Sequence, residues 1–177
     1  MLTMRLDLMN ANEVYLQSLE RRLDRLGVVA STLGQEQTVN PDAIAKAYAC
    51  HNECRKQQPP IELRQEPIAF DRWVTASPEL YFIALHGREY VGVCMFESSA
   101  LRPDTLLSGF TGVVADWNGR GVAKALKAHS LLYARRCGFR FIKTSNLVVN
   151  RAMCAINLSL GFQVVKKHLH SYPIPKN

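Results

Sequence analysis

The stretch TGVVADWNGRGVAKA, from Thr111 to Ala125, decides the fold that this sequence predicts. It begins in an apolar strand, passes through a turn that contains Gly119 and Gly121, and continues directly into a helical pattern. The first N–H groups of a helix have no acceptor within the helix and lie at the positive end of its dipole. Glycines let a phosphate approach the backbone without a Cβ in the way. The stretch therefore predicts an anion site between a strand and a helix.

The same turn also has a plainer interpretation. Two glycines between a strand and a helix can serve only the flexibility of the backbone. The turn lacks the spacing of a dinucleotide-binding fingerprint, and no Gly-Lys-Ser/Thr triplet makes it a P-loop. Taken alone, the turn leaves both interpretations open.

Outside this stretch, apolar spacing predicts alternating helices and strands. Helices are predicted over 12–27, 42–55, 70–76, 121–137 and 152–160, and strands over 4–8, 28–33, 81–85, 90–96, 106–114, 139–144 and 162–172. His86-Gly87-Arg88 joins two of these strands into a hairpin. The order predicts a mixed α/β sheet domain.

Length and composition limit the class of protein. A chain of 177 residues fits one domain, and 47% hydrophobic with 21% charged residues is typical of a folded protein. No apolar run approaches the roughly 20 residues that cross a bilayer. The first twelve residues lack the apolar run of a secretory signal. We therefore expect a cytoplasmic protein with no membrane partner.

Charge and cysteines narrow the partners. The 22 Lys and Arg against 15 Asp and Glu give a net charge of +7, which favours an anionic partner without naming it. The basic residues are scattered and no nucleic-acid-binding motif is present, so no nucleic acid is expected. The five cysteines form no C-x-x-C pair. Cys50, His51 and Cys54 fall in one predicted helix without a second ligand group, so no metal is expected.

The glycine turn resembles a known motif once its neighbours are included. Asn118-Gly119-Arg120-Gly121-Val122-Ala123 is similar to the pyrophosphate-binding motif [QR]-x-x-G-x-[GA] of the GNAT superfamily of N-acetyltransferases. A strand ending in Val113-Val114 precedes it, as in the family. Asn150, then Ile156-Asn157 and Leu160-Gly161-Phe162, follow in the expected order. The resemblance covers roughly residues 81 to 165 and is weak over the first 70.

The resemblance implies a fold and a domain organisation. It implies an α/β GNAT fold, with a central, mostly antiparallel, twisted sheet that is splayed at the cofactor site and flanked by helices. One domain would span residues 1–177. The strand predicted within residues 1–10 is additional, and it could complete this sheet, pair with a dimer partner, or be the remnant of a tandem relative.

The resemblance also implies a binding site for acetyl-CoA, carried over residue by residue. The backbone of Val113, Val114 and Ala115 would pair with the pantetheine arm, beside a bulge between two splayed strands. The pyrophosphate would bind backbone N–H groups of Asn118, Gly119, Arg120, Gly121, Val122 and Ala123. Asn150 would hydrogen-bond the amide-bearing arm. Asn118 stands where the family favours Gln or Arg, so one side-chain contact is weakened.

The implied reaction is direct attack of an acceptor amine on the thioester in a ternary complex. Many family members use an acidic residue on the central strands as a base, but 108–114 contains none. Glu97 is the nearest candidate for the base, with Asp116 behind it. For both carboxylates, a solvated loop residue is the plainer interpretation.

The residue that protonates the leaving thiolate is also in doubt. A Tyr often stands four residues before the glycine of Leu-Gly-Phe, and here that position is Asn157. An amide donates hydrogen bonds but supplies no proton. Tyr133 or Tyr172 could replace the acid, or none is needed, and Asn157 could be only a hydrogen-bonding helix residue. Cys154, within the predicted helix and without a base partner, is interpreted as packing.

Two functions follow from these observations. The first is an N-acetyltransferase that acts on a primary amine of a small-molecule or peptide acceptor, which the sequence does not identify. The alternative is a catalytically degenerate acyl-CoA-binding module, favoured by the absent central acid and by Asn157. A homodimer stays open.

Overall fold

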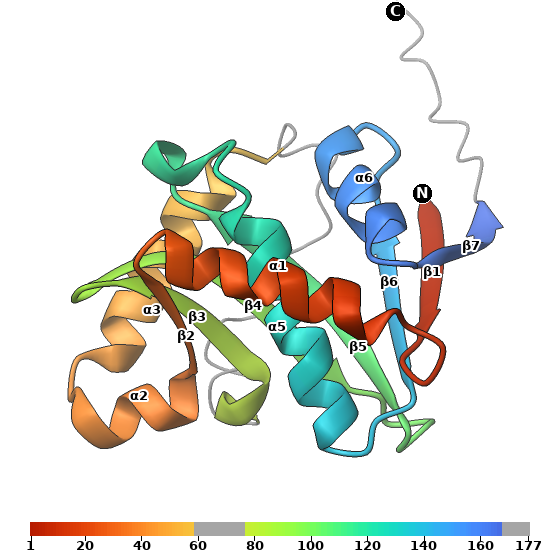
Figure 1. Ribbon diagram of the computed structural model, residues 1–177, viewed down its shortest axis with the longest axis horizontal. Helices are drawn as coiled ribbons and strands as arrows, with labels where there is room; N and C mark the ends of the chain where they lie inside the picture. The colour runs from red at the N-terminus through yellow and green to blue at the C-terminus, as the bar shows by residue number, and fades with distance from the viewer. Residues whose placement is uncertain (59–76, 168–177) are drawn as a thin grey trace, which may run out of the picture.

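The computed structural model of this protein describes residues 1–58 and 77–167 (Figure 1). The helix predicted over 70–76 and the end of the strand predicted over 162–172 lie outside these residues. The helices are α1 (Glu13–Arg25), α2 (Leu33–Val39), α3 (Ala43–Arg55), α5 (Val122–Arg136) and α6 (Arg151–Ser159). The strands are β1 (Leu2–Asp7), β2 (Val28–Thr32), β3 (Tyr81–His86), β4 (Glu89–Ser98), β5 (Thr105–Val113), β6 (Phe141–Asn146) and β7 (Gln163–Lys167). Two short 3₁₀ turns, η2 (Pro78–Leu80) and η3 (Ala115–Trp117), complete the order.

The strands form one mixed sheet in the order β2-β3-β4-β5-β6-β1-β7. Neighbouring strands are antiparallel except β5 and β6, which are parallel. Helices α1 and α5 cover one face together, and α2 and α3 cover the other (Figure 1). The mixed α/β architecture and the mostly antiparallel sheet predicted from the sequence are confirmed. Among the described helices, none is both long enough and apolar enough to span a membrane.

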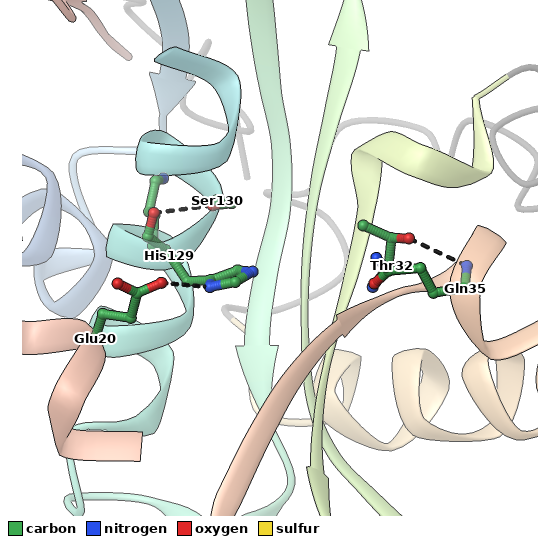
Figure 2. A network of polar contacts seen from close by, with 6 residues as sticks. Glu20, Thr32, Gln35, His129 and Ser130 are labelled. Carbon is green, nitrogen blue, oxygen red and sulfur yellow. Dashed lines mark hydrogen bonds and ion pairs between the residues drawn. The ribbon is translucent and has the colours of Figure 1, made fainter. Parts of the chain in front are cut away.

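Local signals explain where the helices begin. Asn12 caps α1 by accepting a hydrogen bond from the Tyr15 amide at 3.0 Å. Thr32 and Gln35 form a capping box at the start of α2 (Figure 2). The predicted strand ends at residue 33 and is followed by no predicted helix, so α2 is an addition, although this Thr-x-x-Gln pair is its sequence signal.

Packing between α1 and α5 fixes the helix layer on one face of the sheet. The two helices bury leucines such as Leu16 and Leu126 against it. Glu20 of α1 and His129 of α5 add a 2.7 Å contact between carboxylate and imidazole (Figure 2). This packing holds the start of α5 next to the end of β5.

The N-terminal strand completes the sheet of its own domain. Met4 of β1 pairs with Thr144 of β6 on one side and with Val164 of β7 on the other. The first strand of the chain therefore lies between two of its last strands. Met4 and Leu6 are fully packed in the core on the α1 and α5 side of the sheet. Of the three roles that the sequence left open for this strand, the structure shows the first.

Strands β5 and β6 part after a short parallel pairing. The pairing runs from Thr105 to Ser108 on β5 and ends at Ser108 opposite Thr144. Strand β5 continues to Val113, so its edge toward β6 is without a strand partner beyond Ser108. In the register with β4, Met95 stands opposite two residues, 109 and 110, which is a β-bulge. The predicted splay and bulge are both present.

Truncating Met4 tests the role of β1. Met4→Ala should lower the free energy of unfolding by about 2–5 kcal/mol, because it removes a fully buried side chain between two strands. Urea unfolding measures this loss. The control Arg5→Ala, at an exposed neighbour on the opposite face of the strand, should cost less than about 1 kcal/mol. Equal small losses in both variants would contradict a core role for β1.

Candidate functional site

The turn between β5 and α5 has the backbone of an anion cradle. Gly119 and Gly121 adopt positive φ values of 71° and 85°, and α5 begins directly after Gly121. No side chain caps this helix start. Within the described residues, none of the backbone N–H groups of 119–124 donates a hydrogen bond. The turn therefore presents a run of available donors at the positive end of the α5 dipole.

Cationic side chains surround the cradle. Arg120 lies over the Trp117 ring, 4.9 Å from its centroid. Arg22 of α1 reaches the same turn, where its Nε donates to the Arg120 carbonyl at 2.8 Å. Arg22 is not among the predicted site residues, because it lies 98 residues before Arg120 and no local motif contains it.

The open edge of β5 binds an amide group of the protein itself. The Val114 amide donates to Val91 of β4 at 3.0 Å, so the polar backbone groups of Val113 point the opposite way, toward the splay. There the Val113 carbonyl accepts from Nε2 of Gln57 at 2.9 Å. Gln57 in turn accepts a hydrogen bond from the Asn118 side chain. Its amide therefore links the open strand edge to the glycine turn.

A polar cluster lies on the α5 face of the sheet where β5 and β6 part. Asn157 of α6 is 0% exposed and donates to Oδ1 of Asn146 at 2.8 Å. Thr144 of β6 donates to the Ser108 carbonyl at 3.4 Å. Ser108 Oγ and Asn157 Oδ1 are buried without a hydrogen-bond partner. Such orphaned atoms each cost about 1–3 kcal/mol and often mark a ligand site.

The other predicted site residues take identifiable positions. Asn150 caps α6 by accepting from the Met153 amide at 3.2 Å. Glu97 is half-buried and pairs across from Leu107, next to the last residue of β5 that pairs with β6. Glu97 lies two residues after Met95 on β4, and every second residue of a strand points to the same face of the sheet. Met95 packs on the α3 face, so Glu97 lies on that face as well. Asp116 is exposed in η3, which directly precedes the glycine turn.

The alternative proton donors are less well placed. Tyr133 packs on Phe82 of β3 with ring centroids 5.2 Å apart, two strands away from the splay, and burial raises the pKa of its hydroxyl. Tyr172 lies outside the described residues. Cys154 is buried in α6, and burial raises the pKa of its thiol, which fits the packing role predicted for it.

The α3 face carries a buried histidine beside the bulge. His51 lies 3.1 Å from the Tyr81 hydroxyl and 4.5 Å, between ring centroids, from Phe110. Burial, helped by the nearby Arg55 charge, lowers the pKa of His51 to about 4, so this ring is neutral at pH 7. Across residues 1–58 and 77–167, no group of three or more His, Cys, Asp or Glu side chains is arranged to hold a metal ion.

The family of this chain follows from a comparison with known families. The model of the acetyltransferase (GNAT) family matches residues 46–162, which is more than half of the chain. This protein therefore belongs to the GNAT acetyltransferase family. The match begins in α3, earlier than the region in which the sequence motifs were found.

Solved structures share the fold at low sequence identity. A GCN5-related N-acetyltransferase from Sphaerobacter thermophilus superposes with a TM-score of 0.62 at 20% identity, over 92% of this chain and 47% of that one. This chain thus spans about half the length of that structure. The NatC complex bound to Gag peptide and CoA superposes with a TM-score of 0.65 at 18% sequence identity, over 82% of this chain and 91% of that one. Diaminobutyrate acetyltransferase from Paenibacillus lautus was solved with L-2,4-diaminobutyric acid and coenzyme A. It superposes with a TM-score of 0.56 at 20% sequence identity, over 75% of this chain and 73% of that one. No curated protein matches this chain.

The buried histidine predicts a pH dependence of stability. Between the unfolded pKa of 6.5 and the folded pKa of about 4, the unfolded chain binds a proton at His51 that the folded chain does not. Stability should therefore fall as the pH falls through this window, by on the order of 3 kcal/mol in total. His51→Gln should remove this part of the slope in urea unfolding. The exposed His86, replaced in the same way, is the control, and an unchanged slope in His51→Gln would refute the assignment.

Proposed function

We propose that this protein is an N-acetyltransferase that moves the acetyl group of acetyl-CoA to a primary amine by direct attack in a ternary complex. The observation that supports this best is the splay, whose open β5 edge runs into the uncapped start of α5. An extended amide-bearing arm suits the strand edge, and a pyrophosphate suits the helix start. All five cysteines are free thiols, which fits a reducing compartment such as the cytoplasm.

Different groups of the chain would bind different parts of acetyl-CoA. The backbone of Val113, Val114 and Ala115 would take the pantetheine arm, with the Gln57 amide yielding its place at the Val113 carbonyl. The amides of 119–123 would bind the pyrophosphate, whereas the predicted Asn118 amide donates to the Ala115 carbonyl at 3.0 Å. Arg22 and Arg120 would add positive charge. Coenzyme A is named in the two smaller relatives described above, which supports the same ligand here.

The acceptor must lose a proton before it attacks. An alkylamine with a pKa of about 10.4 is almost wholly protonated at pH 7, so the site needs a base or a water chain to one. We assign this role to Glu97, whose half-buried carboxylate lies on the α3 face next to the bulge. Asn157 would donate a hydrogen bond near the thioester from α6. The acceptor is a small-molecule or peptide amine, as the peptide and the diamino acid in the relatives' structures suggest.

The activity itself is tested by thiol release. Acetyl-CoA mixed with a panel of amines, amino acids, aminoglycosides and peptides should release free coenzyme A thiol with at least one of them. Glu97→Gln should then lower kcat by about 10²–10⁴-fold while the affinity for acetyl-CoA is kept, because a general base acts only in the chemical step.

The control for the base is Glu89→Gln, at the exposed opposite end of β4. It should leave kcat unchanged. Binding of acetyl-CoA by calorimetry, with no thiol release for any amine, would contradict the enzyme and support the alternative of a degenerate acyl-CoA-binding module. The replacement of the family's Tyr by Asn157 is the observation that favours this alternative.

The cradle is tested by a matched pair of glycines at the two ends of α5. Gly121 and Gly138 both have φ of 85°. Alanine at either site should cost about 1–2 kcal/mol of stability. Only Gly121→Ala should weaken acetyl-CoA binding, by about tenfold or more, because its Cβ enters the cradle, 2.7 Å from Arg22 Nε. Calorimetry measures both variants, and equal affinities would refute the placement of the pyrophosphate.

A further inference from the structure

Lys127 is a buried cation that the proposed function leaves unused. It lies on the sheet-facing side of α5 and is 1% exposed. Within the described residues its ammonium makes no hydrogen bond and no ion pair, and an aromatic ring is its partner, 5.4 Å away at Phe162. Burial of an ammonium costs several kcal/mol, whereas a cation–π contact returns about 0.5–2 kcal/mol. The contact with Phe162 therefore does not account for a cation at this position.

The stripe of α5 that carries Lys127 packs on β4, next to the open part of β5. Ser130, one turn further along the same face of α5, lies with its Oγ 3.3 Å from Sγ of Cys94. Cys94 Sγ accepts a hydrogen bond from Oγ1 of Thr111, also at 3.3 Å. Thr111 belongs to the part of β5 that no longer pairs with β6. This stripe of α5 therefore packs beneath the splay.

The end of the Lys127 side chain lies toward the other half of the splay. Phe162, whose ring it approaches, donates its backbone N–H to the Asn157 carbonyl at 3.1 Å. Asn157 in turn is joined to Asn146 at the end of β6. In Figure 1 the helix α5 crosses β5, and α6 lies next to β6. Through Phe162, the end of the Lys127 side chain is thus linked to the α6 side of the splay, on the α5 face of the sheet.

The electrostatics suit an exchange of protons with a thiol. Burial lowers the pKa of Lys127 to about 8, and the one ionisable group that acts on it, Cys94 of β4, works in the opposite direction. A pKa of about 8 leaves roughly nine-tenths of the side chain protonated at pH 7. An alkyl thiol has a pKa of about 8.5, so a proton passes between the two groups at little cost.

We propose that the Lys127 ammonium stabilises the coenzyme A thiolate as it departs and then protonates it; this rests on the proposed function. The acceptor nitrogen forms its bond to the carbonyl carbon, and the carbon–sulfur bond breaks with its electron pair left on sulfur. One proton of Lys127 passes to that sulfur. The proton lost by the acceptor nitrogen leaves through Glu97 or water, and Lys127 regains its proton from solvent. Lys127 thereby supplies the proton that Asn157 cannot supply.

The test measures how the thiol contributes to the affinity for coenzyme A, with no acceptor amine present. Coenzyme A and its desulfo analogue, which lacks the thiol, are titrated into the protein by calorimetry from about pH 6 to about pH 7.5, where most Lys127 side chains are still protonated. Over this range the ratio of the wild-type affinity for coenzyme A to that for the analogue should rise by about threefold or more, because a nearby cation favours the thiolate. Lys127→Met should abolish this rise. Lys46→Met, at an exposed lysine of α3 away from the glycine turn, should keep it.

The outcomes separate the two proposals. If the wild type binds neither ligand, the proposed function fails. If it binds both and Lys127→Met shows the same rise with pH, the role of Lys127 is refuted and the proposed function stands. With an active amine, Lys127→Met should also lower kcat by tenfold or more and leave KM for acetyl-CoA nearly unchanged. Thermal unfolding checks the fold, since an apolar side chain at this site should not lower Tm, and Lys127→Gln repeats the test with a polar neutral residue.

Discussion

The parting of β5 from β6 after Ser108 is the constraint on which the rest of the structure depends. Buried backbone groups need partners, and from the bulge to Val113 one edge of β5 has no strand to supply them. Gln57 satisfies one carbonyl of this edge and reaches the glycine turn as well. The helix that follows begins where the open edge ends, so an extended ligand with an anionic end finds both kinds of partner in one line. A fully paired β5 would leave only a helix start on the surface.

The strands on the far side of the splay, β6, β1 and β7, are held together mainly by their own pairing. Strand β1 pairs on both sides, with β6 and with β7, and contributes Met4 and Leu6 to the core. Leu6 lies next to the turn at Gly161, directly before the phenylalanine that Lys127 approaches. The N-terminal residues thus support the α6 side of the candidate site, although they lie far from it in the sequence.

Patterns in the local sequence predicted the features that local interactions determine. They did not predict contacts between residues far apart in the chain. The glycine turn, the hairpin and the ends of α1 and α5 follow from spacing and capping, and all of them appear in the structure. The splay itself came from the family motif. Arg22 and Gln57 reach the turn and the strand edge from helices or helix ends far away in the chain, so nothing in their neighbouring sequence indicates it. Lys127 sits in a regular helical pattern as a charged residue, which in most helices is a solvated one. Its burial becomes visible only when the sheet is in place.

The sheet also separates two groups that the proposed reaction needs apart. Glu97 lies on the α3 face and Lys127 on the α5 face, with one layer of strands between them. A carboxylate and an ammonium in direct contact would stabilise each other's charged forms, which makes the first a weaker base and the second a weaker acid. Here burial acts on Lys127 almost without opposition and lowers its pKa. The splay is an opening between neighbouring strands of this sheet, since β5 and β6 stop pairing after Ser108. Under the two proposals, a thioester held there would lie between Glu97 on one face, which takes the proton of the attacking amine, and Lys127 on the other, which protonates the leaving thiolate.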